Sequence, residues 1–138
     1  MERILVAVDG SAHALKGVRW AANIARGLGL TLDLVYVSFP NLLPPTVYKK
    51  TIDDIDAAET EHAKKVFEEA RKAAGDVRVL ETRGTGGPAE IIADLAAAEH
   101  VWGVVIGAKG HNAVSRVLLG SVADRLVHIC PKPIVVVR

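Results

Sequence analysis

Residues 101–121 read VWGVVIGAKGHNAVSRVLLGS, and the rest of the chain is organised around them. The run Val101–Ile106 is apolar and β-branched, which is typical of a strand buried on both faces. Gly107, Gly110 and Gly120 punctuate the loop that follows, and a hydroxyl residue opens the next amphipathic segment. This order of strand, glycine-rich loop and helix start gathers backbone N–H groups at a helix N-terminus. We therefore predict that the stretch binds the phosphates of a nucleotide.

The composition indicates one domain with helices packed on a buried sheet. Its 138 residues can bury a sizeable core, and we expect residues 1–138 to form a single domain. Half of the residues are hydrophobic but only 4% are aromatic, and the formal net charge of +1 offers no general attraction for nucleic acid or a membrane surface. Cys130 is the single cysteine and no apolar run reaches membrane-spanning length, so we expect a cytoplasmic protein.

Apolar runs and helical repeats alternate along the chain. The expected strands are Arg3–Val8, Thr31–Val37, Val77–Thr82, Val101–Ile106 and Ile134–Val137. The expected helices are His13–Leu28, Thr51–Ala74, Ala89–Ala98 and Ser121–Ile129, and the longer loops are Ser38–Lys50 and Arg83–Gly87. The alternation implies right-handed crossovers and a parallel sheet covered by helices on both faces. The third strand alternates more than the others, which favours a place near a sheet edge.

Individual residues mark the ends of several helices. Ser11 is the expected N-cap of the first helix and Gly29 its C-terminal stop. Pro88 suits the first turn of the third helix, and Ser121 is the expected N-cap of the fourth.

In a parallel sheet the ligand lies at the carboxyl ends of the strands, where the strand order reverses. Asp9, Val37 and Gly107 each stand at the carboxyl end of an expected strand. If the first and fourth strands are neighbours, the crevice between them holds Asp9 on one side and the glycine stretch on the other.

Two common glycine motifs do not match this chain. A P-loop needs G-x-x-x-x-G-K-[ST], and no Gly-Lys pair occurs in the sequence. A dinucleotide fingerprint should follow the first strand, where DGSAHA contains a single glycine. The segment Gly84–Gly87 precedes a helix but lacks both full motifs, which favours a plain turn. The spacing that remains is G-x-x-G, nine residues, then G-S, from Gly107 to Ser121.

That spacing resembles the motif of the nucleotide-binding universal stress proteins. The resemblance covers the whole chain, through VAVDGS at 6–11, VYV at 35–37, GGPAEIIADLA at 86–96 and the final PKPIVVV. It implies a three-layer α/β/α sandwich with a five-stranded parallel sheet in the order 3-2-1-4-5, a Rossmann-like fold of the adenine nucleotide alpha hydrolase-like type. It further implies ATP as the ligand, with or without Mg²⁺ or Mn²⁺, and an antiparallel homodimer formed through Ile134–Val137.

The resemblance also divides the site into an adenosine side and a phosphate side. Asp9 is implied to be the acidic residue on the adenosine side, and Ala7 lies where the strand backbone lines the ribose. The backbone of Val37 is implied to read the adenine edge, and Gly107 to lie near the ribose.

On the phosphate side, the backbone of Gly110 is implied to meet the phosphates, and Gly120, Ser121 and Val122 to hold them at the start of the last helix. Lys109 is a candidate phosphate contact or a solvated loop charge.

The chain departs from the family pattern in the loop between Gly107 and Gly120. Ala108 stands where many members have Ser or Thr, and Asn112-Ala113 replaces what is often a further glycine.

Three classes of function remain open. The first is a nucleotide-binding regulatory or stress-response module, the second a slow ATPase or phosphotransferase on the same site, and the third a dimeric interaction protein that binds no nucleotide. No catalytic residue is assigned, and the five histidines show no metal-ligand spacing. His62, His100 and His128 are interpreted as surface or helix-end residues, and Trp20 and Trp102 as core or interface residues.

Overall fold

The computed structural model describes residues 1–38, 49–109 and 118–138, with side chains from residue 53 onward in the second range. The elements in chain order are β1 (Arg3–Ala7), α1 (Ala12–Leu28), β2 (Thr31–Ser38), α2 (Lys49–Ala74), β3 (Val79–Thr85), α3 (Pro88–Ala96), β4 (Val101–Gly107), α4 (Ser121–Ile129) and β5 (Ile134–Val137).

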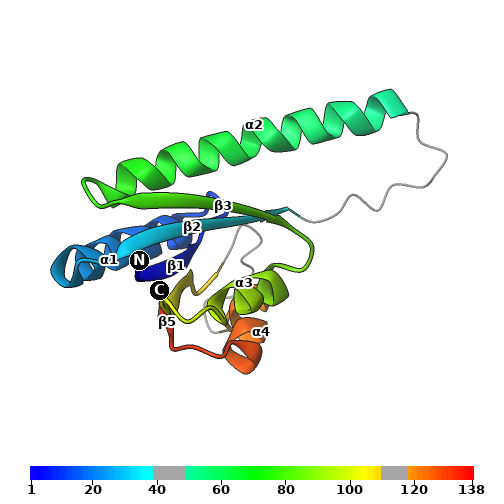
Figure 1. Cartoon of the computed structure of the whole chain (residues 1–138). Helices are drawn as coiled ribbons and strands as arrows, with labels where there is room; N and C mark the ends of the chain where they lie inside the picture. Colours follow the sequence, from blue (N-terminus) through cyan, green and yellow to red (C-terminus); the bar gives the residue numbers. More distant parts are fainter. Residues whose placement is uncertain (39–48, 110–117) are drawn as a thin grey trace.

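The five strands form one parallel sheet in the order β3-β2-β1-β4-β5, which confirms the predicted fold (Figure 1). Helices α1 and α2 pack on one face of the sheet and α3 and α4 on the other. The predicted neighbours β1 and β4 pair directly, with Val6 opposite Val105. As predicted, β3 lies at an edge of the sheet.

Each face of the sheet carries its own hydrophobic core. Val6 and Phe67 belong to the cluster under α1 and α2, and Leu5, Ile92 and Leu126 to the cluster under α3 and α4. Neighbouring residues of β1 therefore point to opposite faces, as successive side chains of a strand do. Because both faces are covered, the strand is apolar from Ile4 to Ala7 instead of alternating.

The predicted helix ends are confirmed at three places. The Ser11 hydroxyl oxygen accepts a hydrogen bond from the backbone N–H of Ala14 at 3.2 Å, which caps α1. Gly29 ends α1 with a φ of +68°, a conformation that favours glycine. Pro88 is the first residue of α3.

The prediction was wrong about the extent of the third strand. We expected Val77–Thr82 followed by a loop from Arg83, whereas β3 runs to Thr85. The segment Arg83–Thr85 pairs in register with the end of β2. Gly84 is needed inside this strand because a Cβ there would lie 2.9 Å from Cγ2 of Ile91 in α3. A glycine that looks like a turn signal is thus explained by close helix packing.

The tryptophans do not lie in the core. Trp20 is 40% exposed and Trp102 is 51% exposed, so the core interpretation was wrong, and their place in an interface stays a prediction.

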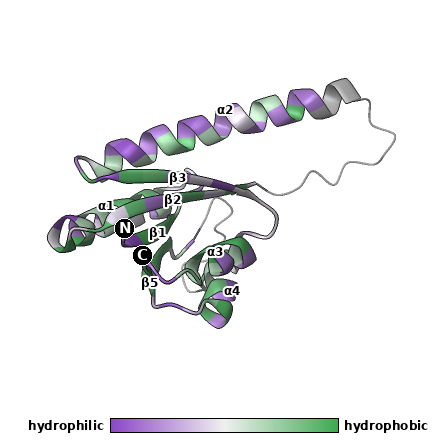
Figure 2. Cartoon of the chain, in the orientation of Figure 1, coloured by the Kyte–Doolittle hydropathy of each residue, from purple (hydrophilic) through white to green (hydrophobic). Residues whose placement is uncertain are grey.

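Figure 2 shows α2 striped with hydrophilic and hydrophobic residues, in keeping with one packed and one solvated face. In the described ranges no helix is both long and apolar enough to cross a membrane.

Candidate functional site

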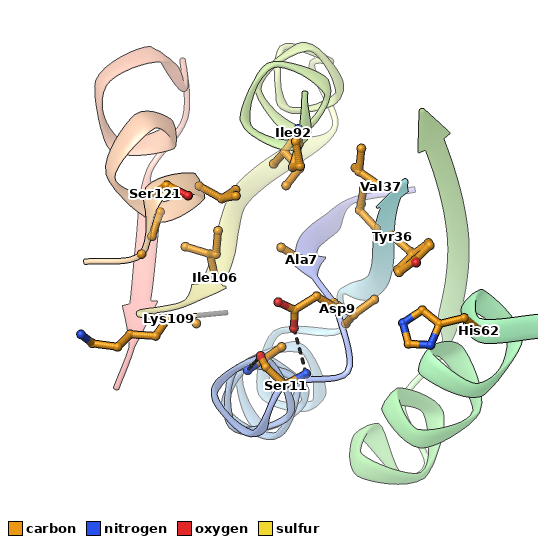
Figure 3. A pocket seen from close by; sticks show the side chains of 18 residues that line it. Ala7, Asp9, Ser11, Tyr36, Val37, His62, Ile92, Ile106, Lys109 and Ser121 are labelled. Carbon is orange, nitrogen blue, oxygen red and sulfur yellow. Dashed lines mark hydrogen bonds between the residues drawn. The ribbon is translucent and has the colours of Figure 1, made fainter. Parts of the chain in front are cut away.

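A pocket of about 370 Å³ opens at the carboxyl ends of β1, β2 and β4 (Figure 3). Eight of the nine predicted site residues line it, and they come from segments far apart in the sequence. These residues are Ala7, Asp9, Val37, Gly107, Lys109, Gly120, Ser121 and Val122. The ninth, Gly110, lies outside the described residues.

The pocket lies where the strand order reverses. After β1 the chain enters α1 on one face of the sheet, and after β4 it reaches α4 on the opposite face. Because β1 and β4 are neighbours, their two connections diverge and leave a crevice between them. The fold therefore brings the Asp9 turn and the N-terminus of α4 to opposite sides of one cavity.

The turn after β1 fixes the orientation of Asp9. Its Oδ1 accepts a hydrogen bond from the backbone N–H of Ser11 at 2.9 Å. Gly10, between them, has a φ of +84°, which favours glycine. Figure 3 shows the Asp9 carboxylate pointing into the pocket. Since an ionised carboxylate can accept several hydrogen bonds, a ligand hydroxyl is a suitable donor for this group.

The end of β2 directs the backbone of Val37 into the crevice. The carbonyl of Val35 faces β1 and accepts a hydrogen bond from Val8 N–H, and the carbonyl of Ser38 faces β3 and accepts one from Gly86 N–H, each at 2.9 Å. Successive residues of a strand direct their amide and carbonyl to opposite edges, so Val37 faces the β1 side. Strand pairing between β1 and β2 ends at Ala7 with Val35. The Val37 amide and carbonyl therefore lie where a base edge could bind them.

The start of α4 supplies the opposite side of the pocket. Gly120, not Ser121 as predicted, is the N-cap, because its carbonyl accepts the first helical hydrogen bond, from Asp124 N–H at 2.9 Å. The Gly120 N–H donates to the carbonyl of Ala108 at 2.7 Å and closes the base of the loop. The other N–H groups of the first turn, those of Ser121, Val122 and Ala123, have no partner within the helix, and all three residues line the pocket.

Gly107 has a steric reason to be glycine that the motif did not reveal. A Cβ there would lie 2.8 Å from the carbonyl carbon and the Cβ of His13, and 2.9 Å from the nitrogen of Ala14. The start of α1 thus packs directly on the end of β4. This contact places the start of α1, which follows the Asp9 turn, against Gly107 at the end of β4.

The sequence prediction missed the α2 side of the pocket, where Tyr36 and His62 also line it. The Tyr36 hydroxyl donates a hydrogen bond to the Glu59 carboxylate, and its ring makes edge contacts with His62 at 5.9 Å and Phe67 at 6.2 Å between centroids. Burial, helped by Glu59, raises the pKa of Tyr36 to about 12. The same hydrogen bond holds the pKa of Glu59 below its ordinary value. Nothing in the local sequence signalled His62, because its place depends on how α2 packs on β2.

A parallel sheet of this order, with a pocket at the switch point bordered by a helix N-terminus, defines a protein of the doubly wound α/β class. Residues 1–138 match the model of the universal stress protein family, and the chain belongs to this family. It is 34% identical over 143 residues to a universal stress protein of Mycolicibacterium smegmatis, covering 98% of this chain and 47% of that relative, so it spans about half of that relative's length. It is 32% identical over 135 residues to the "Universal stress protein in QAH/OAS sulfhydrylase 3'region" of Thermus aquaticus, covering 98% and 97% of the two chains.

Solved structures share the fold. Universal stress protein UspA from Lactobacillus plantarum superposes with a TM-score of 0.87 at 26% identity, over 99% of this chain and 97% of that one. A universal stress protein in complex with cAMP has a TM-score of 0.71 at 23% identity, over 99% and 96%. The universal stress protein from Archaeoglobus fulgidus in complex with dAMP has a TM-score of 0.61 at 23% identity, over 100% and 98%.

Proposed function

We propose that this chain binds ATP and acts as a nucleotide-binding regulatory module in a stress response. The observation that carries the proposal is the convergence of eight residues, chosen from the glycine motif and from the family resemblance, on one pocket. Asp9 and Val37 would hold the adenosine, and the start of α4 with Lys109 would hold the phosphates. Gly110 remains part of the proposal, although it lies outside the described residues.

The character of the pocket lining suits such a ligand. A volume of about 370 Å³ falls within the usual range for small-molecule sites. The nucleoside side is lined by apolar side chains that include Val35, Val37 and Ile92, against which a base can pack. The opposite side combines the N–H groups of a helix N-terminus with the Lys109 ammonium, which together favour an anion.

The cAMP and dAMP complexes show that two proteins of this fold hold an adenine nucleotide. In the described part of this chain no three His, Cys, Asp or Glu side chains come together to hold a metal ion. We therefore propose that Mg²⁺ or Mn²⁺, where it accompanies ATP, is held mainly by the phosphates. We place ATP hydrolysis or phosphotransfer below simple binding, because Asp9 lies across the pocket from α4.

The substitution Gly120→Val tests the site. Gly120 has a φ of −59°, which any residue can adopt, so the change adds bulk at the start of α4 without straining the backbone. We expect the ATP affinity, measured by titration calorimetry, to fall at least about tenfold, or about 1.4 kcal/mol. The circular dichroism spectrum should stay unchanged, and nucleotide released by denaturing the purified wild type should be ATP.

The matched control is Gly27→Val, on an exposed position of α1 where an added Cβ meets nothing within 4 Å. We expect it to bind ATP as the wild type does. Wild-type protein that binds no ATP, or Gly120→Val protein that binds it with undiminished affinity, would refute the proposed site.

We further propose a cytoplasmic homodimer formed through β5. This strand is an edge of the sheet, and its residues Ile134–Val137 are all only partly buried in the single chain. An apolar edge strand invites pairing with another strand, here an antiparallel second copy. Light scattering at micromolar concentration should give twice the mass of one chain, and the mass of one chain would contradict the dimer.

The proposed cytoplasmic location rests on the cysteine content, because a single cysteine suits the reducing cytoplasm.

A further inference from the structure

The pocket extends beyond the predicted adenosine residues to the side chains of Tyr36 in β2 and His62 in α2. Figure 3 shows His62 reaching from α2 toward Tyr36 and Asp9. We propose that His62, backed by Tyr36, contacts the nucleoside half of the bound nucleotide and sets the affinity for that half. The proposal rests on the ATP site proposed above and adds to it a residue outside the glycine motif.

Tyr36 and His62 form one wall of the pocket. The strand order places this wall near the nucleoside and not near the phosphates. Tyr36 belongs to β2 and the start of α4 follows β4, while β1 lies between the two strands. Neighbouring strands are about 4.8 Å apart, so the two walls are separated by roughly 10 Å across the sheet. One end of an extended nucleotide therefore lies near α4 and the other end near His62.

Tyr36, the buried part of this wall, is fixed before any ligand binds. Tyr36 is only 6% exposed, its hydroxyl donates to Glu59, and Phe67 packs against its ring. The imidazole of His62 stands against this ring with 66° between the ring planes. Because the Tyr36 ring is already held, a ligand that packs against this side of the pocket orders mainly the exposed His62 side chain, which favours binding.

The chemistry of the wall suits a nucleoside. Aromatic rings pack on a nucleobase, and an imidazole nitrogen can donate to or accept from a sugar hydroxyl or a base edge. On the neighbouring turn, the Asp9 carboxylate lines the same pocket and supplies an acceptor. A phosphate would instead be repelled by the Asp9 carboxylate, which lines this end of the pocket, because both groups are anions.

The test compares ATP with adenosine, which lacks phosphates, by titration calorimetry. We expect His62→Ala to weaken both ligands by about the same factor, roughly tenfold, as loss of one ring–base contact does. Lys109→Ala, which removes the ammonium proposed to contact the phosphates, should weaken ATP and leave adenosine unchanged. His100→Ala, an exposed histidine just before β4 at the opposite end of the strands, should leave both unchanged.

A second variant separates packing from polar contact. His62→Phe keeps a ring on the wall and should bind adenosine more tightly than His62→Ala does, and all variants should give the wild-type circular dichroism spectrum. Adenosine affinity that is unchanged in His62→Ala, while the wild type binds ATP, overturns the role of His62 alone. A loss confined to ATP also overturns it, because His62 would then act on the phosphates. A wild type that binds neither ligand overturns the ATP site as well.

Discussion

Backbone contacts hold the β4–α4 side of the pocket in shape, whereas side-chain hydrogen bonds hold the Asp9 turn and the α2 side in shape. Gly107 lets α1 pack on the end of β4, and Gly120 N–H closes the loop on the Ala108 carbonyl. Across the pocket, the Asp9 carboxylate accepts a hydrogen bond from Ser11 N–H, and the Tyr36 hydroxyl donates one to the Glu59 carboxylate. The first side therefore depends on the absence of a side chain at a few positions, whereas the second depends on hydrogen-bonded pairs, one within a turn and one between β2 and α2.

The largest effect should follow Gly107→Ala, which breaks the backbone side. The new Cβ would lie 2.8 Å from main-chain and Cβ atoms of His13, so α1 or β4 must move. We expect overpacking to lower the free energy of unfolding by about 2–3 kcal/mol. Thermal unfolding should then occur roughly 10 °C below that of the wild type.

Gly27→Ala provides the matched control. Gly27 lies in α1, the helix that Gly107 contacts, but it has open space around the added Cβ. The substitution should raise the free energy of unfolding by up to about 1 kcal/mol, because alanine favours the helix. If Gly107→Ala unfolds at the wild-type temperature, the packing of α1 on β4 does not explain this glycine.

The same contrast explains what could be predicted from the sequence. The strand–helix alternation is a local pattern, and it predicted a parallel sheet covered on both faces. The motif from Gly107 to Ser121, with the family resemblance that it carries, implied the strand order and eight of the residues that line the pocket. The extension of β3 through Gly84 was missed, because the partner strand and Ile91 decide it. His62 was missed for a similar reason, since the packing of a helix on a distant strand places it in the pocket.

A smaller, pH-dependent effect should follow Tyr36→Phe on the side-chain wall. At pH 7 the loss of the hydrogen bond to Glu59 should lower the free energy of unfolding by about 1 kcal/mol. Below the ordinary Glu59 pKa of 4.5 this difference should shrink, because the pKa of Glu59 is lowered in the folded protein and the stabilisation is lost as the carboxylate is protonated.

The difference should shrink at high pH as well. The pKa of Tyr36 is raised from 10.0 to about 12 on folding, so between these values the unfolded state loses the phenol proton while the folded state keeps it. The wild type therefore loses stability as the pH rises from 10 toward 12, and Tyr36→Phe has no such loss at this position. Urea unfolding of both proteins from pH 3 to pH 11 measures the difference. Glu59→Gln should abolish the acid part of the dependence and reduce the alkaline part to what the burial of Tyr36 causes. A difference that stays constant across this range would show that the Tyr36–Glu59 hydrogen bond does not stabilise the α2 side of the pocket.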